Sequence, residues 1–495
     1  MPPASQTSAP SAAHAFAPRR YGELQKVTER VYLFRNITNS SFVIGTRGVA
    51  VIDTQVNTPS ALEFLRFIRS VTDKPILYVI NTHYHWDHTN GNAIFKAEGA
   101  EGVSSKLTRE FMVKRAPRQK EFLAGRGFEL GKDPLLPETT FEGERLLDLG
   151  DLSLRLFFAG KAETDDATAV YVPRENVLMS GDTVMTGSFP IFGQPVWDEG
   201  LQGDRQWIET IRRLMDLKPA HVLPGHGPLA HDAEIDKLIR IEEFFLEEVG
   251  TRVRKGMPIE QTLGEIEAQL PGWIREMPIV WGTPRYAALR VWRGLTKSPQ
   301  DPEQGWQRYK PSAISAADAS RVEQVTSGKE ILSDYLQMAS EAKEGGDTAL
   351  RLSILKKAIQ RFQDSPDSFI AYAEALVEES RREPSVLEKG DFFQEARSCW
   401  DKAFRLHPGH TGALLAKGRY LTMMAYRGGD DPQTGMRLLQ QVIQAAPGTR
   451  IQAEAEFYLG MGYRRLGEET KARAQFQKAL ACNPAFVPAR LALDS

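Results

Sequence analysis

Short runs of hydrophobic residues, many of them β-branched, dominate the first half of the chain. Between residues 31 and 82, strands are predicted for the segments VYLFRN, SFVIGT, VAVIDT and ILYVINT. The same pattern returns in LSLRLFFA, ATAVYVP, NVLMSGDT and HVLPGHG. The segment SALEFLRFIRSV has apolar residues at helical spacing. Strands mixed with helices over about 200 residues predict an α/β layered domain with buried sheets.

After Asp232 the pattern changes to that of helices. The segment AEIDKLIRIEEFFLEEVGTRVRKG places five apolar residues on one face, namely Ile235, Leu238, Ile241, Phe245 and Val249. A further helix is predicted for PRYAALRVWRGL, then a loop, and then AISAADASRVEQVTSGKE as a linker or a short helix. We expect a disordered tail over 1–22, an α/β domain over 23–232, a helical segment over 233–312, a linker over 313–330 and helical repeats over 331–495.

The last part of the chain is helical and repetitive. Its clearest unit is AEAEFYLGMGYRRLGEETKARAQFQKALACNPAF, in which seven residues stand at the spacing of the tetratricopeptide (TPR) pattern: Leu459, Gly460, Tyr463, Ala472, Phe476, Ala479 and Pro484. The aromatic residue of that pattern is displaced by one position, to Phe457. Stacked helical hairpins of this kind form an α-solenoid whose concave face binds a protein partner, or they pack and self-associate. Both alternatives stay open.

Composition and charge narrow the classes of protein that remain. The chain has 495 residues, with Lys+Arg 62 against Asp+Glu 64. This balance argues against a nucleic-acid binder, and no apolar stretch is long enough for a membrane span. The N-terminal tail is rich in Ala, Pro and Ser, and a transit peptide is its lesser interpretation. Two cysteines far apart, Cys399 and Cys482, fit a reducing compartment, so we expect a cytoplasmic protein.

Histidine is scarce, at nine residues, yet three of them fall in the segment NTHYHWDHTNGN directly after an apolar strand. His83, His85, Asp87 and His88 therefore lie at a strand end, where side chains can converge. Imidazole nitrogens and carboxylate oxygens are ligands of Zn²⁺ and similar metals. Residues 83 and 85 would share one face of an extended strand and 87 and 88 would lie at the turn, so this segment could serve two metal ions.

The segment resembles the H-x-H-x-D-H signature of the metallo-β-lactamase superfamily, whose fold is an αββα sandwich. The resemblance covers roughly residues 25 to 230 and includes three further motifs. VAVIDT supplies Asp53 in the place of a carboxylate that supports a ligand, SGDT supplies Asp182 in the place of the metal-bridging carboxylate, and LPGHGP supplies His226 in the place of the last ligand.

One family motif departs from the pattern. Where a third histidine is usual, this chain has GKAETDDATAVYVP, and alignment on ATAVYVP places Glu163 in that position. The alternative is that Asp165 or Asp166 coordinates instead. A glutamate here resembles the alkylsulfatase branch of the superfamily, and it permits Mn²⁺ or Fe as well as Zn²⁺. The segment WGTPRYAALRVWRGL likewise resembles the dimerisation segment of alkylsulfatase-like proteins, which implies a homodimer.

The resemblance implies two divalent metal ions, Zn²⁺ in the first place. His83, His85 and Glu163 would hold one ion, Asp87, His88 and His226 the other, with Asp182 between them. A metal-bound hydroxide would attack the substrate while Asp87 orients it or takes its proton. Asp87 and Asp182 are thus the candidate catalytic residues. The expected function is alkylsulfatase-like cleavage of a sulfate or related ester by a dinuclear hydrolase.

Other functions stay open beside this one. The same scaffold could hydrolyse a thioester, a lactone, a β-lactam or a phosphodiester, or the chain could be a TPR-centred assembly protein with an inactive hydrolase domain. An oxidative iron centre fits less well, because the first histidine cluster is intact. For substrate contacts we consider an apolar wall for a small molecule with a hydrophobic tail, from SFPIFGQPVWDEG together with Tyr84 and Trp86, and an anion partner among Lys161, Arg155 and Arg205. His221 and His231 are interpreted as structural.

Overall fold

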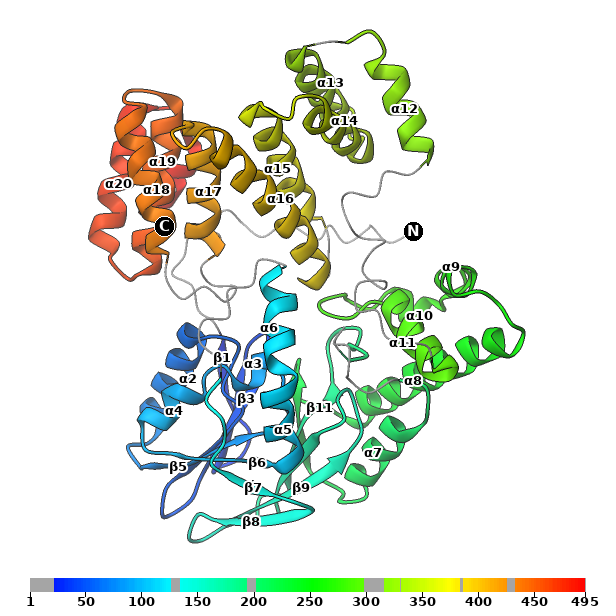
Figure 1. Ribbon diagram of the computed structural model, residues 1–495. Coiled ribbons are helices and arrows are strands. Elements are labelled where there is room, and N and C mark those ends of the chain that lie inside the picture. The colour runs from blue at the N-terminus through cyan, green and yellow to red at the C-terminus, as the bar shows by residue number, and fades with distance from the viewer. Residues whose placement is uncertain are drawn as a thin grey trace, which may run out of the picture. The chain divides into compact units, whose positions relative to one another are not determined.

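The computed structural model describes residues 22–125, 134–193, 202–297, 316–329, 331–382, 386–424 and 432–494. These residues form two compact units (Figure 1). The first contains all the described strands and the helices as far as α11 (Pro284–Thr296). The second consists mainly of the helices from α12 (Ala316–Thr326) to α21 (Val487–Asp494). The tail predicted over 1–22 lies, except for its last residue, outside the described residues.

Seven strands form the first sheet in the order in which they occur along the chain. Strands β1 to β4 pair antiparallel and β4 to β7 pair parallel. The strands are β1 (Glu23–Lys26), β2 (Val31–Arg35), β3 (Ser40–Ile44), β4 (Val49–Ile52), β5 (Ile76–Asn81), β6 (Glu101–Ser105) and β7 (Thr139–Phe141).

Parallel neighbours in this sheet need crossover connections. Helix α2 (Thr58–Val71) supplies the one between β4 and β5. This helix begins where the Asn57 side chain accepts a hydrogen bond from the Ser60 N–H, with proline in its first turn. Helices α5 (Lys106–Lys114) and α6 (Ala116–Gly125) follow β6 in the same way.

Five strands form the second sheet, in the order β12-β11-β10-β9-β8. Strands β8 to β11 pair antiparallel, whereas β11 and β12 pair parallel. The strands are β8 (Glu144–Asp148), β9 (Ser153–Gly160), β10 (Ala167–Val172), β11 (Val177–Met185) and β12 (His221–His226). Every residue of β11 is buried, because it lies inside the sheet with both faces covered.

The two sheets pack face to face and helices cover their outer faces. A core drawn from both sheets lies between them and includes Val43, Ile80, Leu156 and Met179. A second core joins the first sheet to α2 and α4 (Asn92–Ala97), and a third joins the second sheet to α7 (Gln206–Met215) and α8 (Asp232–Arg254). Four layers in the order αββα result, so the predicted sandwich is confirmed.

The helices that follow the sandwich belong to the same unit. They are α8, α9 (Ile259–Gln269), α10 (Gly272–Arg275) and α11. The five residues predicted for one face of α8 are all buried and lie in the core that also covers the second sheet. The middle of α11 is buried there too, including Tyr286, Leu289 and Val291. This apolar face is therefore occupied within its own chain.

The second unit is all-helical within its described residues. Its helices are α12, α13 (Leu332–Glu344), α14 (Thr348–Arg361), α15 (Pro366–Ser380), α16 (Val386–Leu406), α17 (Thr411–Met424), α18 (Gln433–Ala445), α19 (Arg450–Arg465), α20 (Glu469–Cys482) and α21. Neighbours such as α13 and α14 or α19 and α20 pack on one another, and α12 packs on α14, α15 on α17 and α17 on α19. At Gly460 a Cβ atom would lie 2.6 Å from the Phe476 ring, so only glycine permits α19 and α20 to approach so closely. The helical C-terminal region is confirmed, and its TPR-like character stays a prediction.

Some elements differ from the prediction. Strands β1, β6, β7 and β8 were not predicted, because ELQK, EGVSS, TTF and ERLLD are short and partly polar. For 313–330 a linker or a short helix was expected, and the structure has the short helix α12 there. The loop expected before it, over 297–312, lies outside the described residues after Lys297. Among the described helices, none is both long and apolar enough to cross a bilayer.

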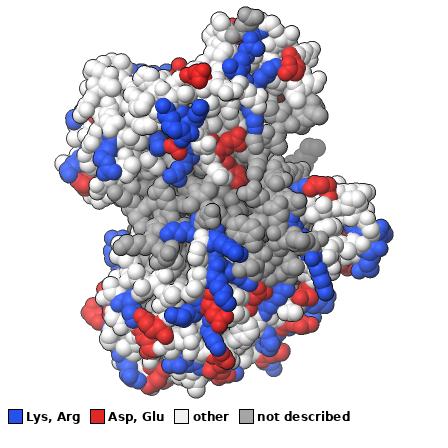
Figure 2. Space-filling model, in the orientation of Figure 1, with Lys and Arg blue, Asp and Glu red and all other residues white. Residues whose placement is uncertain are grey.

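Surface charges of the strand-rich unit are paired locally. Figure 2 shows acidic and basic side chains intermixed on the visible face of this unit. Lys106 pairs with Glu142 at 2.7 Å, and Arg155 pairs with Glu144 at 2.7 Å across the β8–β9 hairpin. Because water screens such exposed pairs, they add little to stability and leave no single-signed patch on this face.

Candidate metal centre

The first four candidate ligands come from the segment that follows β5. This strand ends at Asn81, and helix α3 (Trp86–Thr89) begins after a short connection. His83 and His85 lie in that connection, not on one face of a strand as predicted. Asp87 and His88 lie in α3. The tight turn from strand to short helix brings all four side chains to one edge of the sheet.

The other three candidate ligands come from the second sheet. Glu163 lies in the connection that follows β9, Asp182 lies within β11, and His226 is the last residue of β12. Because β11 and β12 are parallel neighbours, their carboxyl-terminal ends meet at the same edge of the sheet. The structure thus brings together all seven residues that the sequence singled out.

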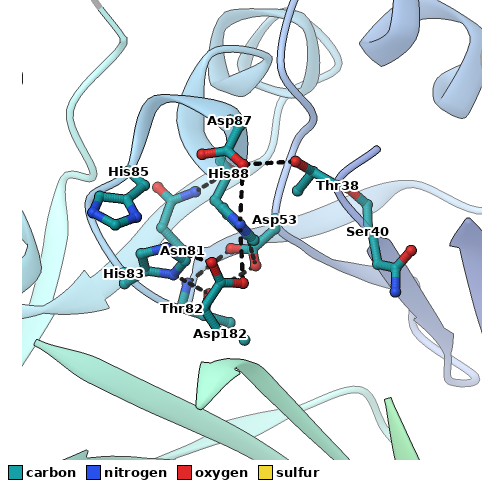
Figure 3. A network of polar contacts seen from close by, with 12 residues as sticks. Thr38, Ser40, Asp53, Asn81, Thr82, His83, His85, Asp87, His88 and Asp182 are labelled. Carbon is teal, nitrogen blue, oxygen red and sulfur yellow. Dashed lines mark hydrogen bonds and ion pairs between the residues drawn. The ribbon is translucent and has the colours of Figure 1, made fainter. Parts of the chain in front are cut away.

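These seven side chains form two adjoining groups. His83, His85, Glu163 and Asp182 form one group, and Asp87, His88 and His226 form the other, with one ligand atom from each residue within 4.8 Å of the rest of its group. Asp182 lies between the groups: its oxygens are 3.7 Å from His83 Nε2, 3.3 Å from His88 Nε2 and 3.3 Å from His226 Nε2. Figure 3 shows His83, His88 and Asp182 turned toward a common centre.

The residues of both groups are almost fully buried, with exposed fractions of 6 % or less. Several of their polar atoms nevertheless accept or donate no hydrogen bond within the described part of the chain. These atoms are His83 Nε2, His88 Nε2, Asp87 Oδ1 and Asp182 Oδ1. A buried polar atom without a partner costs about 1–3 kcal/mol, so their common direction indicates a bound ligand.

Electrostatics inside the cluster suit a cation. Burial alone would raise the pKa of the Asp182 carboxyl, but the imidazoles of His226 and His88 outweigh it and hold that pKa well below its usual range. Burial lowers the pKa of His83 well below its usual value, and the neighbouring His88 adds to this. Asp182 is therefore ionised and His83 neutral near pH 7, which are the forms that bind a metal ion. Against the effect of burial, Asp182 and Asp87 raise the pKa of His226 to about 10 and that of His88 well above its usual value, so a metal ion would displace a proton from each of these two imidazoles.

Asp53 supports the cluster from behind, as predicted. Its Oδ2 lies 2.8 Å from His88 Nδ1, and its carboxylate also accepts hydrogen bonds from the backbone and hydroxyl of Thr82. Asp53 has a left-handed backbone conformation, with φ 57°. Because the carboxylate accepts the Nδ1 proton, His88 directs its Nε2 at the centre and can bind a metal ion through it.

The structure distinguishes the three acidic residues that the sequence left open. Glu163 Oε2 lies 3.4 Å from His85 Nδ1, inside the first group. Asp165 instead pairs with Arg115 at 3.2 Å. Asp166 is buried beside the group, and burial raises its pKa to about 6. Neither belongs to a ligand group, so Glu163 is the acidic residue placed to coordinate.

A narrow pocket leads to the cluster. Besides five of the candidate ligands, its lining consists of Trp86, Ile191 and Trp281. Trp281 packs edge-on against Trp86, with 6.5 Å between ring centroids, and lies 5.9 Å from the His226 ring. Two of these walls were anticipated, Trp86 and Ile191, the latter from SFPIFGQPVWDEG, whose end from residue 194 lies outside the described residues. Trp281 was missed, because it lies far beyond the sandwich in sequence.

The basic residues considered as partners of an anionic substrate are not among the described residues that line the pocket. Arg155 pairs with Glu144, Arg205 with Glu243 and Lys161 with Asp204. Tyr84 is buried against the His85 ring and does not reach the pocket. His231 precedes α8, where its N–H donates to Glu234, and His221 begins β12. The described walls of the pocket are therefore apolar and aromatic.

The donor set fits metal ions. Four imidazoles and three carboxylates, all buried and convergent, are a ligand set for Zn²⁺, Mn²⁺ or Fe. The fold and this site define a metal-binding α/β sandwich.

Comparison with known proteins identifies the class of the sandwich. The family model described as Metallo-beta-lactamase superfamily matches residues 33–226, and these residues form a domain of that superfamily. The chain is 30% identical over 209 residues to the 2,4-dinitroanisole O-demethylase subunit alpha of Nocardioides sp. (strain JS1661), a match covering 41% of this chain and 55% of that protein. It is 23% identical over 220 residues to a metallo-beta-lactamase type 2 of Elizabethkingia meningoseptica, covering 41% and 78%. The chain thus spans about half the length of the first relative.

The similarity to solved structures extends beyond the sandwich. The sec-alkylsulfatase Pisa1 from Pseudomonas sp. aligns with a TM-score of 0.54 at 15% identity, covering 78% of this chain and 66% of that one. A double mutant of the same enzyme gives 0.56 at 16%, covering 76% and 65%. At such identities the likeness shows the fold alone.

Proposed function

We propose that this protein is a dinuclear metal-dependent hydrolase that cleaves a sulfate ester, or a related ester, carrying an apolar group. The observation that carries the proposal is the pair of buried ligand groups that adjoin at Asp182, below a pocket with apolar walls. The fold likeness to a sec-alkylsulfatase supports the choice of ester. Glu163 supports it too, because it occupies the position in which the alkylsulfatase branch has a glutamate.

The residues have distinct roles in this proposal. His83, His85 and Glu163 would hold one ion and Asp87, His88 and His226 would hold the other, with Asp182 between the two groups. When bound, the two ions supply Lewis acidity and a water nucleophile at neutral pH. Zn²⁺ is the first candidate, with Mn²⁺ and Fe as alternatives.

The protein contributes orientation and exclusion of water. Asp87 Oδ1 makes no hydrogen bond with the described residues, and Asp87 lies in the pocket lining, so it is placed to orient the nucleophile or to take its proton. Asp53 fixes the tautomer of His88. Trp86, Ile191 and Trp281 hold the apolar part of the substrate and keep bulk water from the reacting bond.

A second candidate reaction is cleavage of an aryl ether. It is favoured by the 30% identity to a 2,4-dinitroanisole O-demethylase subunit and by the two tryptophans of the pocket, which suit an aromatic ring. β-Lactam, lactone, thioester and phosphodiester hydrolysis remain further alternatives on the same ligand set.

Substrate profiling of the metal-loaded protein tests these proposals. We expect turnover of dodecyl sulfate and of a secondary alkyl sulfate, and none of 2,4-dinitroanisole, a lactone, a thioester or a β-lactam. Turnover of 2,4-dinitroanisole alone would favour the second candidate. Fewer than two ions per chain by elemental analysis, with no turnover of any of these compounds, would instead favour an assembly protein with an inactive domain.

The remaining assignments concern the rest of the chain. We propose that residues 233–312 support a homodimer, that residues 331–495 are TPR-like repeats that bind a protein partner, and that the protein is cytoplasmic. Light scattering on the full chain tests the first of these, and a monomer at all concentrations would refute it.

A further inference from the structure

Two residues of the loop between β2 and β3, Ile37 and Thr38, contact ligands of the candidate metal centre, and a third, Asn39, contacts the end of β12. Ile37, Thr38 and Asn39 follow β2 closely, and the side chains of Thr38 and Asn39 are buried. None of them was singled out by the sequence, because isoleucine, threonine and asparagine in a hairpin loop carry no metal-ligand signal. Figure 3 shows Thr38 reaching from this loop to Asp87.

Two of the loop's contacts go to ligands of the second group. The Thr38 hydroxyl donates a hydrogen bond of 2.8 Å to Asp87 Oδ2. The backbone carbonyl of Ile37 lies 2.6 Å from His226 Nδ1. A carbonyl oxygen only accepts, so Nδ1 of His226 carries a proton and Nε2 is directed at Asp87 and Asp182.

A third contact ties the loop to the strand end that carries His226. Asn39 Nδ2 donates to the carbonyls of Pro224 and Gly227, and the Asn39 N–H donates to the carbonyl of Gly225. The loop and the end of β12 therefore hold one fixed position relative to each other, although they come from different sheets.

One buried side chain holds the loop in turn. Gln55 Nε2 donates to the Thr38 carbonyl at 2.8 Å and to Ser40 Oγ at 2.7 Å, and Gln55 Oε1 accepts from Asn36 at 2.8 Å. Gln55 is fully buried and has a left-handed backbone, with φ 78°. A residue other than glycine is strained in this conformation, which indicates that its side-chain contacts outweigh the strain.

Different residues orient the ligands of the two groups. Asp87 and His226 are oriented by the loop at 37–38, and His88 by Asp53, two residues before Gln55. In the first group, one such contact is between His83 Nδ1 and Thr82 Oγ1, at 3.0 Å, and Thr82 in turn donates to Asp53. The loop at 37–38 thus contacts ligands of the second group, whereas Asp53 is linked to a ligand of each group.

We propose that Thr38 is a positioning residue for the second metal ion, and that Gln55 braces the loop that places it. The inference rests on the proposed dinuclear centre. Thr38→Val removes the hydroxyl with little change in side-chain volume, and it leaves Asp87 free to rotate. Loss of such an orienting partner lowers metal affinity by about 10–100-fold.

Titration of the metal-free full chain with Zn²⁺ alone, followed by counting of the ions kept after dialysis, tests the proposal. We expect wild type to keep two ions, and Thr38→Val to keep one with its affinity unchanged while the other binds about 10–100-fold more weakly. Thr38→Ser, which retains the hydroxyl, should restore the second ion. Thr262→Val is the matched control, because Thr262 is equally buried but lies on α9, outside the ligand groups.

A second variant, at Gln55, tests the role of the loop without changing Thr38. Gln55→Gly removes the brace and also the backbone strain, so the chain retains a permitted conformation there. It should weaken the second ion as Thr38→Val does, and the double variant should be less than additive, because both changes act through one loop. The circular dichroism of each metal-free variant should match that of wild type.

The outcomes separate the two proposals. Wild type that keeps fewer than two ions would refute the dinuclear centre itself. Two ions in wild type and in Thr38→Val, at equal affinities, would refute only the positioning role, as would loss of both ions in equal measure from a folded Thr38→Val.

Discussion

The two units of the molecule differ in how their buried polar side chains are arranged. In the strand-rich unit, seven ionisable side chains from both sheets converge on one point. In the helical unit, the polar contacts of buried side chains lie apart from one another, such as those of Tyr372 with Glu395 at 2.8 Å and of Arg464 with Glu469 at 2.6 Å. Each such contact joins two groups, whereas the convergence of several carboxylates and imidazoles at one point favours a bound cation. The contrast places the chemistry in the first unit.

The largest effect should come from the residue that joins the two ligand groups. Asp182→Ala removes the carboxylate that contacts both, so we expect turnover to fall by about 10³-fold or more, together with loss of bound metal. Steady-state kinetics and elemental analysis measure the two effects. Asp148→Ala is the control, because Asp148 is exposed and pairs with Arg47 at the surface. Unchanged turnover in Asp182→Ala would contradict the bridging role.

The next effect should fall on the helical unit alone. Trp400 is buried in its core, with 1 % of its surface exposed, and Trp400→Ala should destabilise this unit by about 3–5 kcal/mol. Thermal unfolding of the full chain measures the shift, and Trp400→Phe should lose less. Because the two units have separate cores, we expect the metal content to stay at its wild-type value. Loss of bound metal from Trp400→Ala would show that the two units are not independent.

Much of the fold was accessible from sequence because hydrophobic spacing dictates which face of an element is buried. The strands with continuous apolar runs, such as β4 and β5, were predicted, and so was β11, which begins with the apolar residues VLM. Strands β6 and β7 were not, because each is a short, polar stretch whose pairing is decided by its neighbours in the sheet. Strand β8 lies at a sheet edge, where alternation is weak.

The candidate site was accessible for a different reason. Metal ligands come from few residue types, so His83, His85, Asp87 and His88 stood out in a histidine-poor chain. Thr38, Gln55 and Trp281 did not, because threonine, glutamine and tryptophan carry no ligand signal and reach the site only through tertiary structure. Ile37 acts through its backbone carbonyl, which no sequence pattern reports.

A moderate effect is expected at the one ligand position that departs from the family pattern. Glu163→His replaces a carboxylate by an imidazole beside His85, so the first group loses negative charge. We expect metal to be retained, turnover to change by about tenfold, and the preference for Zn²⁺ over Mn²⁺ to increase. Kinetics with each metal measure this. Asp165→Asn is the control, and a larger effect there than at Glu163 would reverse their assignment.

The smallest effect concerns an ionisable group of the first unit that lies apart from the ligand cluster. Glu242, on α8, is buried, and its Oε1 makes no hydrogen bond with the described residues. Burial raises the pKa of this carboxyl well above its usual value of 4.5, and the charge of Lys161 opposes the shift only in part. The folded chain therefore binds this proton more tightly than the unfolded chain does.

The raised pKa of Glu242 makes the free energy of unfolding depend on pH. The stability contributed by protonated Glu242 is fully present below pH 4.5, and it is lost as the pH rises through the raised pKa. Glu242→Gln should remove this slope, which amounts to at most about 1.4 kcal/mol for each step of one pH unit. Urea unfolding from pH 4 to pH 8 measures the difference from wild type. Glu243→Gln is the control, because Glu243 is partly exposed and pairs with Arg205. Equal slopes in wild type and Glu242→Gln would contradict the prediction. If the slope disappears while the metal content stays unchanged, burial of the Glu242 carboxyl affects stability but not metal binding. The feature that distinguishes the metal centre is then the convergence of carboxylates with imidazoles.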